Sequence, residues 1–352
     1  MKITSRSRAA FAVIAATTLA VSLSACSKDS DTPAASGSGS NSGGGIGVDL
    51  PRADSDFWNA YAKYIPTKAK DLGVTLTSTT NSQNDVQKLL TNIDSLVAQG
   101  AKALVTAPQD TGAVASKLDE LAGKKIPVIT VDTRPDSGAV YMVVRADNRA
   151  YGTKACEFLG EKLGGKGKVI EFQGSLSSIN GRDRSEAFKE CMTKKFPDIK
   201  VFEEPTEWEG AKAQAALETR LTTDPDIKGV YMQAGGVFLD PTLQVLKQRG
   251  LLVPPSDPKH IFIVSNDGIP QEFDAIRKGE IDATVSQPAD TYAGIGLYWA
   301  KQALAGVTPK EGPTDHGSNV ITLPNGFEDQ LPAPLVTKDN VDDASLWGNA
   351  KS

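Results

Sequence analysis

The chain has 352 residues, and its 38 Lys and Arg against 43 Asp and Glu give a formal net charge of -5. This mildly acidic balance argues against a nucleic-acid partner, because duplex binding depends on cationic side chains that neutralise phosphates. Its 2 His and 3 Cys are too few for a His-built metal centre, a four-Cys zinc site or a disulfide scaffold. We therefore expect neither a metal nor a cofactor, and the length predicts roughly two domains of about 150 residues each.

The N-terminus has the pattern of a signal peptide. A basic start precedes an almost wholly apolar or small stretch over 9–23, which is shorter than the about 20 apolar residues that a membrane span needs. Leu-Ser-Ala-Cys follows at 23–26, and small residues before a cysteine resemble a bacterial lipobox. We therefore expect removal of residues 1–25 and acylation of Cys26, which would anchor an extracytoplasmic protein to the membrane. A plain signal peptide with a chance cysteine is the alternative.

Residues 26–45 are rich in Ser and Gly and contain no large apolar residue. Such a composition cannot bury enough surface to fold. We expect a flexible tether that spans on the order of 25 Å, although composition alone does not exclude an N-terminus without purpose.

From residue 46 onward, the hydrophobic pattern alternates between strands and helices. The order βαβα predicts a parallel sheet covered by helices on both faces. The first run has strands over 46–50, 74–77, 103–105 and 126–131 and helices over 55–72, 83–99 and 111–122, with Pro66 expected to kink or split the first helix.

A second run of the same kind starts after about residue 147. Two consecutive runs predict an α/β fold with two doubly wound parallel-sheet lobes, and the strand ends of both lobes should meet at one cleft. This run has helices over 149–163, 181–196, 209–222, 238–249 and 270–278 and strands over 168–172, 199–203, 229–232, 261–264 and 283–285.

Polar side chains follow three of these strands. Asp132 comes directly after the strand that ends at Val131, and Asp267 and Gln287 follow two strands of the second run. One such residue is equally well explained as a helix cap or a turn residue. Their repetition in one context favours a binding site.

Aromatic and cationic side chains add to this pattern. Phe57 and Trp58 open the first helix, Trp208 stands in an acidic stretch with few apolar neighbours, and Arg184 lies near a helix start. The rings could instead be core residues, and a solvated surface role for Arg184 is equally plausible. Rings together with Asp, Arg and Gln suit a sugar or polyol, whose C–H faces stack while its hydroxyls both donate and accept.

The chain resembles the ribose-binding branch of bacterial type I periplasmic sugar-binding proteins, the soluble receptors of ABC importers. The likeness covers most of 46–306 and lies in the order of short motifs, none specific by itself. These are Asp-Phe-Trp at 56–58, Pro-Val-Ile-Thr-Val-Asp at 127–132, Ala-Asp-Asn at 146–148, Val-Ile-Glu-Phe-Gln-Gly at 169–174, Arg-Ser-Glu-Ala-Phe at 184–188, Asn-Asp-Gly at 266–268 and Ala-Thr-Val-Ser-Gln at 283–287.

The resemblance implies a two-lobed fold with a three-strand hinge and a ligand site between the lobes. Three departures imply a hydroxyl pattern unlike that of ribose: Pro51 replaces a serine, Ala234 beside Gln233 replaces an asparagine, and Thr133 followed by Arg134 replaces an arginine. The implied ligand-binding residues are Asp54, Ser55, Phe57, Trp58, Asp132, Arg134, Arg184, Trp208, Gln233, Asp267 and Gln287.

Three arginines, Arg134 among them, also lie near the inferred cleft, namely Arg52, Arg134 and Arg145. They could favour an acidic sugar, but exposure at the rim is the simpler interpretation.

The resemblance also implies how the chain divides between the lobes. The first lobe would comprise 46–146 and 289–315, and the second 147–287 and 318–352, including a strand over 320–323. The chain would thus cross between the lobes near 145–147, 287–289 and 315–318. No role is predicted for the Pro-rich tail beyond 324. Cys156 and Cys191 lie on helices of the second lobe and can form a disulfide outside the cytoplasm, with two buried free thiols as the alternative.

These features predict a monomeric binding protein that closes around its ligand and docks on a membrane permease. An enzyme is disfavoured, because no Gly-x-Gly-x-x-Gly follows the first strand and no Gly-x-Ser-x-Gly or phosphate loop occurs. A sugar-responsive repressor would need a DNA-binding head where this chain has a signal sequence. A receptor for chemotaxis or other signalling on the same fold remains an alternative that the sequence does not distinguish from import.

Overall fold

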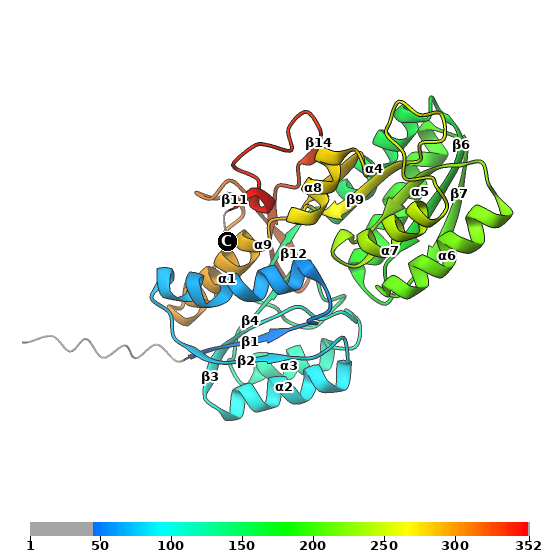
Figure 1. Ribbon diagram of the computed structural model, residues 1–352. Helices are drawn as coiled ribbons and strands as arrows, with labels where there is room; N and C mark the ends of the chain where they lie inside the picture. Colours follow the sequence, from blue (N-terminus) through cyan, green and yellow to red (C-terminus); the bar gives the residue numbers. More distant parts are fainter. Residues whose placement is uncertain (1–44, 351–352) are drawn as a thin grey trace, which may run out of the picture. The chain divides into compact units, whose positions relative to one another are not determined.

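The computed structural model describes residues 45–350 (Figure 1). The predicted signal peptide, Cys26 and the tether up to residue 44 lie outside the described residues. Among residues 45–350, no helix combines the length and the apolar character that crossing a membrane requires.

The first lobe is built on an eight-stranded sheet with the order β11-β12-β13-β5-β4-β3-β1-β2. Helices α1 (Asp56–Leu72) and α9 (Ala289–Leu304) pack on one face, and α2 (Val86–Ala98) and α3 (Ala115–Gly123) pack on the other. The strands are β1 (Gly45–Leu50), β2 (Leu76–Asn81), β3 (Ala101–Thr106), β4 (Val128–Val131), β5 (Met142–Ala146), β11 (Gly312–Pro313), β12 (Asn319–Leu323) and β13 (Gly326–Leu331).

The second lobe is built on a six-stranded sheet with the order β14-β10-β9-β8-β6-β7. Its strands are β6 (Lys166–Gln173), β7 (Asp198–Pro205), β8 (Ile227–Met232), β9 (Phe262–Asp267), β10 (Ala283–Ser286) and β14 (Leu335–Thr337). One face is covered by α4 (Asn148–Lys162) and α5 (Ile179–Lys195), and the other by α6 (Gly210–Thr223), α7 (Gly235–Gln248) and α8 (Pro270–Lys278). A short 3-10 helix, η1 (Trp347–Asn349), follows β14.

Each sheet is buried on both faces, which explains the apolar runs in the sequence. Met142 and Val144 of β5 enter the core under α1 and α9, whereas Val143 enters the core over α2 and α3. In β6, Val169 and Ile170 likewise enter opposite cores. Successive side chains of a strand point to opposite faces, so a sheet between two helical layers needs apolar residues in succession. The predicted fold class is confirmed, although β5, β11, β13, β14 and α9 are missing from the predicted elements.

The expectation that Pro66 kinks or splits the first helix is wrong as to splitting, because α1 runs unbroken from Asp56 to Leu72. A proline removes one helical hydrogen bond and leaves the carbonyl four residues earlier without its partner. Pro66 is exposed, whereas Tyr61, Ile65 and Ala69 anchor the opposite side of the helix in the core. The freed carbonyl can therefore bond water, and the buried face keeps the helix continuous.

The prediction that strand 320–323 belongs to the second lobe is wrong. β12 pairs antiparallel with β13, and β13 pairs parallel with β5 of the first sheet. The chain reverses between Leu323 and Gly326, which are paired residues, and this hairpin places β13 between β12 and β5 within the first sheet. The chain then enters the second sheet as β14, antiparallel to β10. The third crossing therefore lies at 332–334 and not at 315–318, while the first two lie between β5 and α4 and between β10 and α9.

Cys156 on α4 and Cys191 on α5 form a disulfide. The bond closes a loop with a sequence separation of 35, and closing a loop of this size stabilises a protein by about 3–4 kcal/mol in the chain-entropy model. We expect the double variant C156S/C191S to lose stability of this order in denaturant unfolding. Reductant should lower the stability of the wild type and leave the variant unchanged. Equal stabilities of the two oxidised proteins would contradict the prediction.

Candidate functional site

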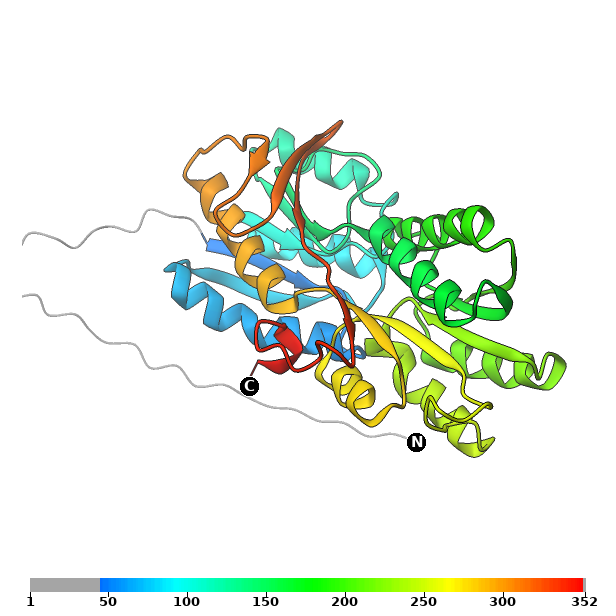
Figure 2. The same ribbon diagram turned by 90° about the horizontal axis from the view of Figure 1, so that it is seen from above.

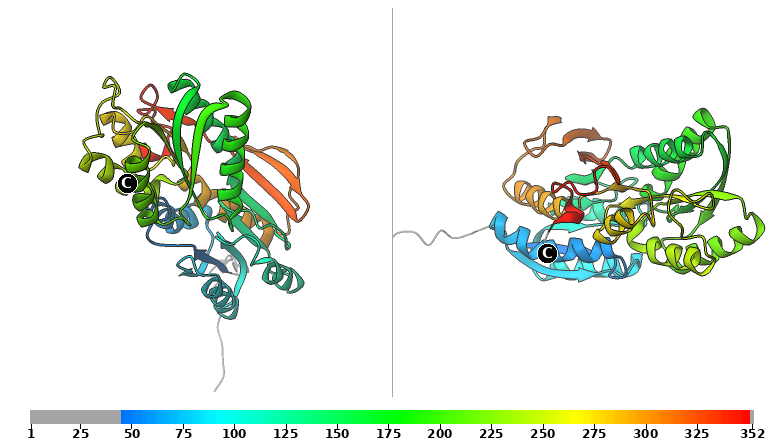
Figure 3. Two further views of the ribbon diagram at one scale, coloured as in Figure 1. Left: turned by 90° about the vertical axis from the view of Figure 1, so that its right-hand side faces the viewer. Right: turned by 45° about the horizontal axis from the view of Figure 1, so that its top comes forward.

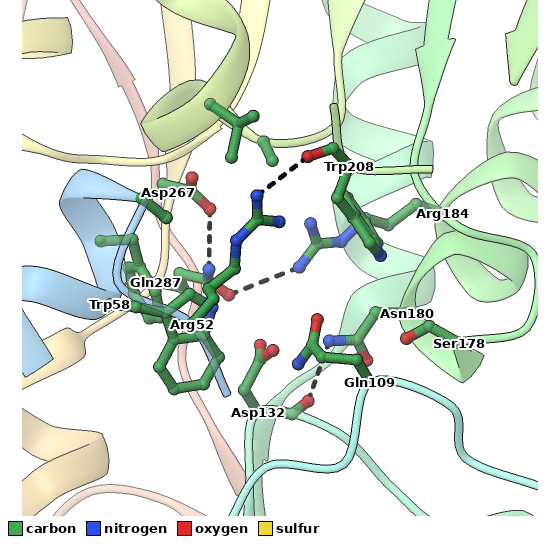
Figure 4. Close-up of a pocket in the computed structure, with 14 residues that line it drawn as sticks. Arg52, Trp58, Gln109, Asp132, Ser178, Asn180, Arg184, Trp208, Asp267 and Gln287 are labelled. Atoms are coloured by element: carbon green, nitrogen blue, oxygen red, sulfur yellow. Dashed lines mark hydrogen bonds between the residues drawn. The ribbon is translucent and has the colours of Figure 1, made fainter. Parts of the chain in front are cut away.

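A pocket lies between the two lobes, and eight of the predicted ligand-binding residues line it (Figure 4). It encloses about 390 Å³ of empty space, a figure that includes the part open to solvent. The predicted residues in the lining are Ser55, Phe57, Trp58, Asp132, Arg184, Trp208, Asp267 and Gln287, and the others are Arg52, Gln109, Ser178, Asn180, Ala234 and Val237.

The ends of parallel strands bring the carboxylates and the amide to this pocket. Asp132 directly follows β4, Asp267 ends β9, and Gln287 directly follows β10. Both aspartates have positive φ angles, 63° for Asp132 and 115° for Asp267. Such angles are uncommon for residues other than glycine, and here they occur at the two points where the chain leaves a sheet. The geometry therefore agrees with the rule that open parallel sheets present their ligand groups at the carboxyl ends of strands.

The aromatic residues of the first lobe come from the start of α1. Phe57 and Trp58 are edge-to-face, with ring centroids 5.2 Å apart. Both are also core residues, with 2% and 6% exposure. The rings therefore line the pocket and belong to the core, the two roles that the sequence offered as alternatives. Because the rings are held by core packing, their pocket-facing sides are rigid.

Trp208 supplies the aromatic wall of the second lobe. Glu207 and Trp208 both adopt left-handed backbone conformations, with φ of 53° and 59°, which redirect the chain between β7 and α6. The ring lies over Gly174, where a Cβ would come within 1.9 Å of the Trp208 ring. The indole Nε1 is buried and has no hydrogen-bond partner among the described residues, so it can donate to a ligand.

Arg184 is the buried cation of the site, with 2% exposure. Its Nε donates to Asn148 Oδ1 at 2.6 Å, its Nη1 donates to the Gln233 carbonyl, and its Nη2 donates to Gln287 Oε1 at 3.4 Å. The guanidinium carbon lies 5.7 Å from the Trp208 ring centroid. These contacts exclude the solvated surface role that the sequence left open.

Two buried carboxylates face this cation. Burial raises the pKa of Asp132, and the charges of Arg184 and Arg145 oppose that rise. Burial likewise raises the pKa of Asp267, against Arg184 and the bonds that its carboxylate accepts from the Gly236 amide at 2.8 Å and from Gln287 Nε2 at 2.7 Å. Asp132 Oδ1 is buried and unpartnered in the described part of the chain. The site thus offers a carboxylate oxygen that a ligand hydroxyl could satisfy.

Two arginines that the sequence analysis placed at an exposed rim are buried, so that interpretation is wrong for them. Arg52 is 6% exposed and Arg145 is 2% exposed. Arg52 Nη2 donates to the Trp208 carbonyl of the opposite lobe at 3.1 Å, and its Nε donates to Asp54 at 2.6 Å. Arg145 Nη2 donates to Asp183 of the second lobe at 2.9 Å. Both arginines therefore join the two lobes beside the pocket.

Three predicted site residues do not line the pocket. The Asp54 side chain is 74% exposed and pairs with Arg52. The Arg134 side chain is about one-third exposed and lies 3.9 Å from Glu328. Gln233 is fully buried, and its side chain accepts from the Gly174 amide and donates to Glu171 and Ser185. It therefore supports the loop under Trp208 from within the second lobe.

Four lining residues were not anticipated, namely Gln109, Ser178, Asn180 and Val237. Gln109 follows β3, and Ser178 and Asn180 lie at the start of α5 after β6. The strand-end rule would have found these three had it been applied to every strand. Val237 lies in the first turn of α7, and its apolar side chain carried no such signal.

Glu171 is fully buried next to Gln233, and burial raises its pKa to about 8. Between its ordinary pKa, near 4.5, and this value, the folded protein binds more protons than the unfolded chain, so stability falls as pH rises through that window. We expect E171Q to flatten the decline of Tm between pH 5 and pH 8.5. The exposed α4 variant E161Q should retain the wild-type slope. Parallel curves for E171Q and wild type would contradict the prediction.

Within residues 45–350, no cluster of three or more His, Cys, Asp or Glu could hold a metal ion. The pocket itself offers hydrogen-bonding groups, two carboxylates, two guanidinium groups and aromatic faces.

Two parallel-sheet lobes with a polar, aromatic-lined pocket at the ends of their strands define a two-lobed solute-binding protein. The chain belongs to the family described as periplasmic binding protein domain, whose model matches residues 46–308. This membership confirms the predicted resemblance and the predicted class, a binding protein and not an enzyme.

Individual relatives agree with this assignment. The ribose import binding protein RbsB of Haemophilus influenzae is 29% identical over 253 residues, which are 72% of this chain and 83% of that protein. The xylitol-binding protein of Mycolicibacterium smegmatis is 27% identical over 264 residues, 74% of this chain and 68% of that protein. A solved ABC transporter solute-binding protein from Mycobacterium smegmatis, with bound glycerol, has a TM-score of 0.72 at 25% identity and covers 84% of this chain and 94% of its own.

Proposed function

We propose that this protein captures a neutral monosaccharide or polyol between its lobes and delivers it to the permease of an ABC importer. One observation carries the proposal: aromatic, carboxylate and guanidinium groups of both lobes converge on one pocket. Trp58 and Asp132 come from the first lobe, and Trp208, Arg184 and Asp267 from the second. A ligand that contacts both sets favours the closed arrangement by its differential affinity for that state.

The pocket suits a hydroxyl-rich guest with apolar faces. Ring faces stack on C–H surfaces, and carboxylates accept charge-assisted hydrogen bonds, which are about twice as strong as neutral ones. The unpartnered Asp132 Oδ1 and Trp208 Nε1 supply one acceptor and one donor, which matches the dual character of a hydroxyl.

A neutral ligand is favoured over an acidic one, because the cations of the site are already neutralised. Arg52 pairs with Asp54 and bonds the Trp208 carbonyl. Arg184 faces Asp132 and Asp267, and its charge opposes the rise that burial causes in their pKa values. A ligand carboxylate would bring a further acidic group to this buried cluster. Relatives named for ribose and xylitol point to the same neutral class.

The proposal extends to the location of the protein. The lipobox-like sequence at 23–26 supports acylation of Cys26, and residues 27–44 would let the binding lobes reach a permease from the anchored end. We propose that the protein acts as a membrane-anchored, extracytoplasmic monomer.

Titration calorimetry against a panel of pentoses, hexoses and polyols tests the proposed ligand class. The panel includes ribose and xylitol, with glucuronic acid as the charged comparison. We expect one-to-one binding of at least one neutral compound and weaker binding of the acid. Absence of binding throughout the panel, or a preference for the acid, would contradict the proposal.

A further inference from the structure

The C-terminal segment, defined as residues 338–350, lies beyond the part of the chain that matches the family model, which ends at residue 308. Nothing in its sequence predicts a role. It follows β14 of the second sheet and contains η1. Figure 2 shows it in red next to α8, in yellow, and α1, in blue, and the right-hand view of Figure 3 agrees.

Most of this segment is anchored to the second lobe. Val341 and Leu346 are buried in the core cluster that contains α8 residues. Arg277 on α8 donates from Nε to the Asp342 carboxylate at 2.8 Å and from Nη2 to Asn349 Oδ1 at 2.7 Å. The segment should therefore move with the second lobe.

Trp347 is the exception, because it also packs into the first lobe. Its ring is edge-to-face with Phe57 of α1 at a centroid distance of 6.0 Å and belongs to the core cluster of the first lobe, together with Tyr292. Its indole Nε1 donates to the backbone carbonyl of Asp267 at 3.2 Å. Trp347 thus contacts one pocket residue from each lobe, from behind the pocket wall.

The contact with Asp267 supports an uncommon backbone conformation. Asp267 has a φ of 115°, and its backbone carbonyl also accepts a hydrogen bond from the backbone N–H of Gln287 at 3.0 Å. Close approach of the segment requires Gly348, because a Cβ there would lie 2.5 Å from the Gly268 carbonyl. The segment therefore fits closely against the loop that aims Asp267 into the pocket.

We propose that residues 338–350 form a clasp that stabilises the closed arrangement of the lobes, with Trp347 as a positioning residue for ligand binding. Opening the lobes would separate the Trp347 ring from Phe57, because the remainder of the clasp is fixed to the second lobe. A ligand that binds only the closed state has an apparent Kd inversely proportional to the closed fraction. The clasp therefore raises affinity without touching the ligand. The affinity part of this proposal rests on the proposed function.

The test compares W347A, W347F and a control, L221A, with the wild type. Leu221 on α6 belongs to the core cluster of the second lobe and not to the first-lobe cluster that holds Trp347. L221A therefore loses core packing without removing the contacts of Trp347 with Phe57 and Asp267. W347F keeps an aromatic ring against Phe57 but removes the indole donor, and it serves if W347A does not fold. Small-angle scattering of the ligand-free proteins reports lobe separation, and stopped-flow dissociation and calorimetry with ribose and xylitol report binding.

We expect ligand-free W347A to be more open than L221A, and its affinity to be about tenfold weaker because dissociation is faster. W347F should lie between W347A and wild type. The clasp is overturned if both Trp347 variants match L221A in scattering and in dissociation rate. If the wild type binds neither compound, the ligand-free scattering still decides the clasp, while the proposed function alone is called into question.

Discussion

Replacing Arg184 with methionine should weaken sugar binding by at least about a hundredfold and lower the free energy of unfolding by about 3–5 kcal/mol, the cost of leaving buried charges without their partner. Arg184 is the cation shared by Asp132 and Asp267. It also donates to Asn148 Oδ1, which loses this donor in the variant, and to the Gln233 carbonyl, which keeps only the bond from Asn266 Nδ2. Calorimetry and denaturant unfolding measure the two effects.

Two variants separate charge from geometry at this position. R184K keeps a positive charge but lacks the planar fork that reaches Asn148, Gln233 and Gln287 together. We therefore expect a stability between those of R184M and the wild type, and weak binding. R149M removes an exposed arginine of α4 that pairs with Glu186 and Glu190, and it should bind as the wild type does. Wild-type affinity in R184M would show that Arg184 only completes the core.

The second large effect is expected from G174A, which should weaken binding by about tenfold to a hundredfold and lower the free energy of unfolding by about 1–3 kcal/mol, because a buried ring must move. The Gly174 backbone tolerates a side chain, since its φ is not positive, but the new Cβ would lie 1.9 Å from the Trp208 ring. The ring must move, and with it the second-lobe wall of the pocket. Each 1.4 kcal/mol of lost contact corresponds to about tenfold in Kd.

A matched glycine provides the control for this variant. Gly123 ends α3, and a Cβ there would meet no atom within 4 Å. G123A should therefore bind with wild-type affinity. If G174A also binds normally while W208A does not, the ring can be accommodated in a second position. Binding would then not depend on the position that the Trp208 ring has in this structure.

The lobes and the pocket share one structural cause, which is the repeated alternation of strand and helix. Side chains just past the ends of parallel strands lie at the carboxyl edge of their own sheet, as Asp132 does in the first lobe and Gln287 in the second. Their role could be inferred from position along the chain without knowledge of any contact. The same reasoning extends to Gln109 and Asn180, which lie outside the short motifs that carried the family resemblance.

Local pattern determined the lobes, the buried strands and the polar strand ends, because these depend on periodicity and on the order of elements along the chain. Long-range packing decided the rest. Gln233 turns into the core under Trp208, Arg52 is buried across the lobe interface, and the hairpin of β12 and β13 adds to the first sheet. Trp347 reaches Asp267 across a separation of 80 residues. Contacts between residues so far apart leave no period in the sequence, since only the folded chain brings their partners together.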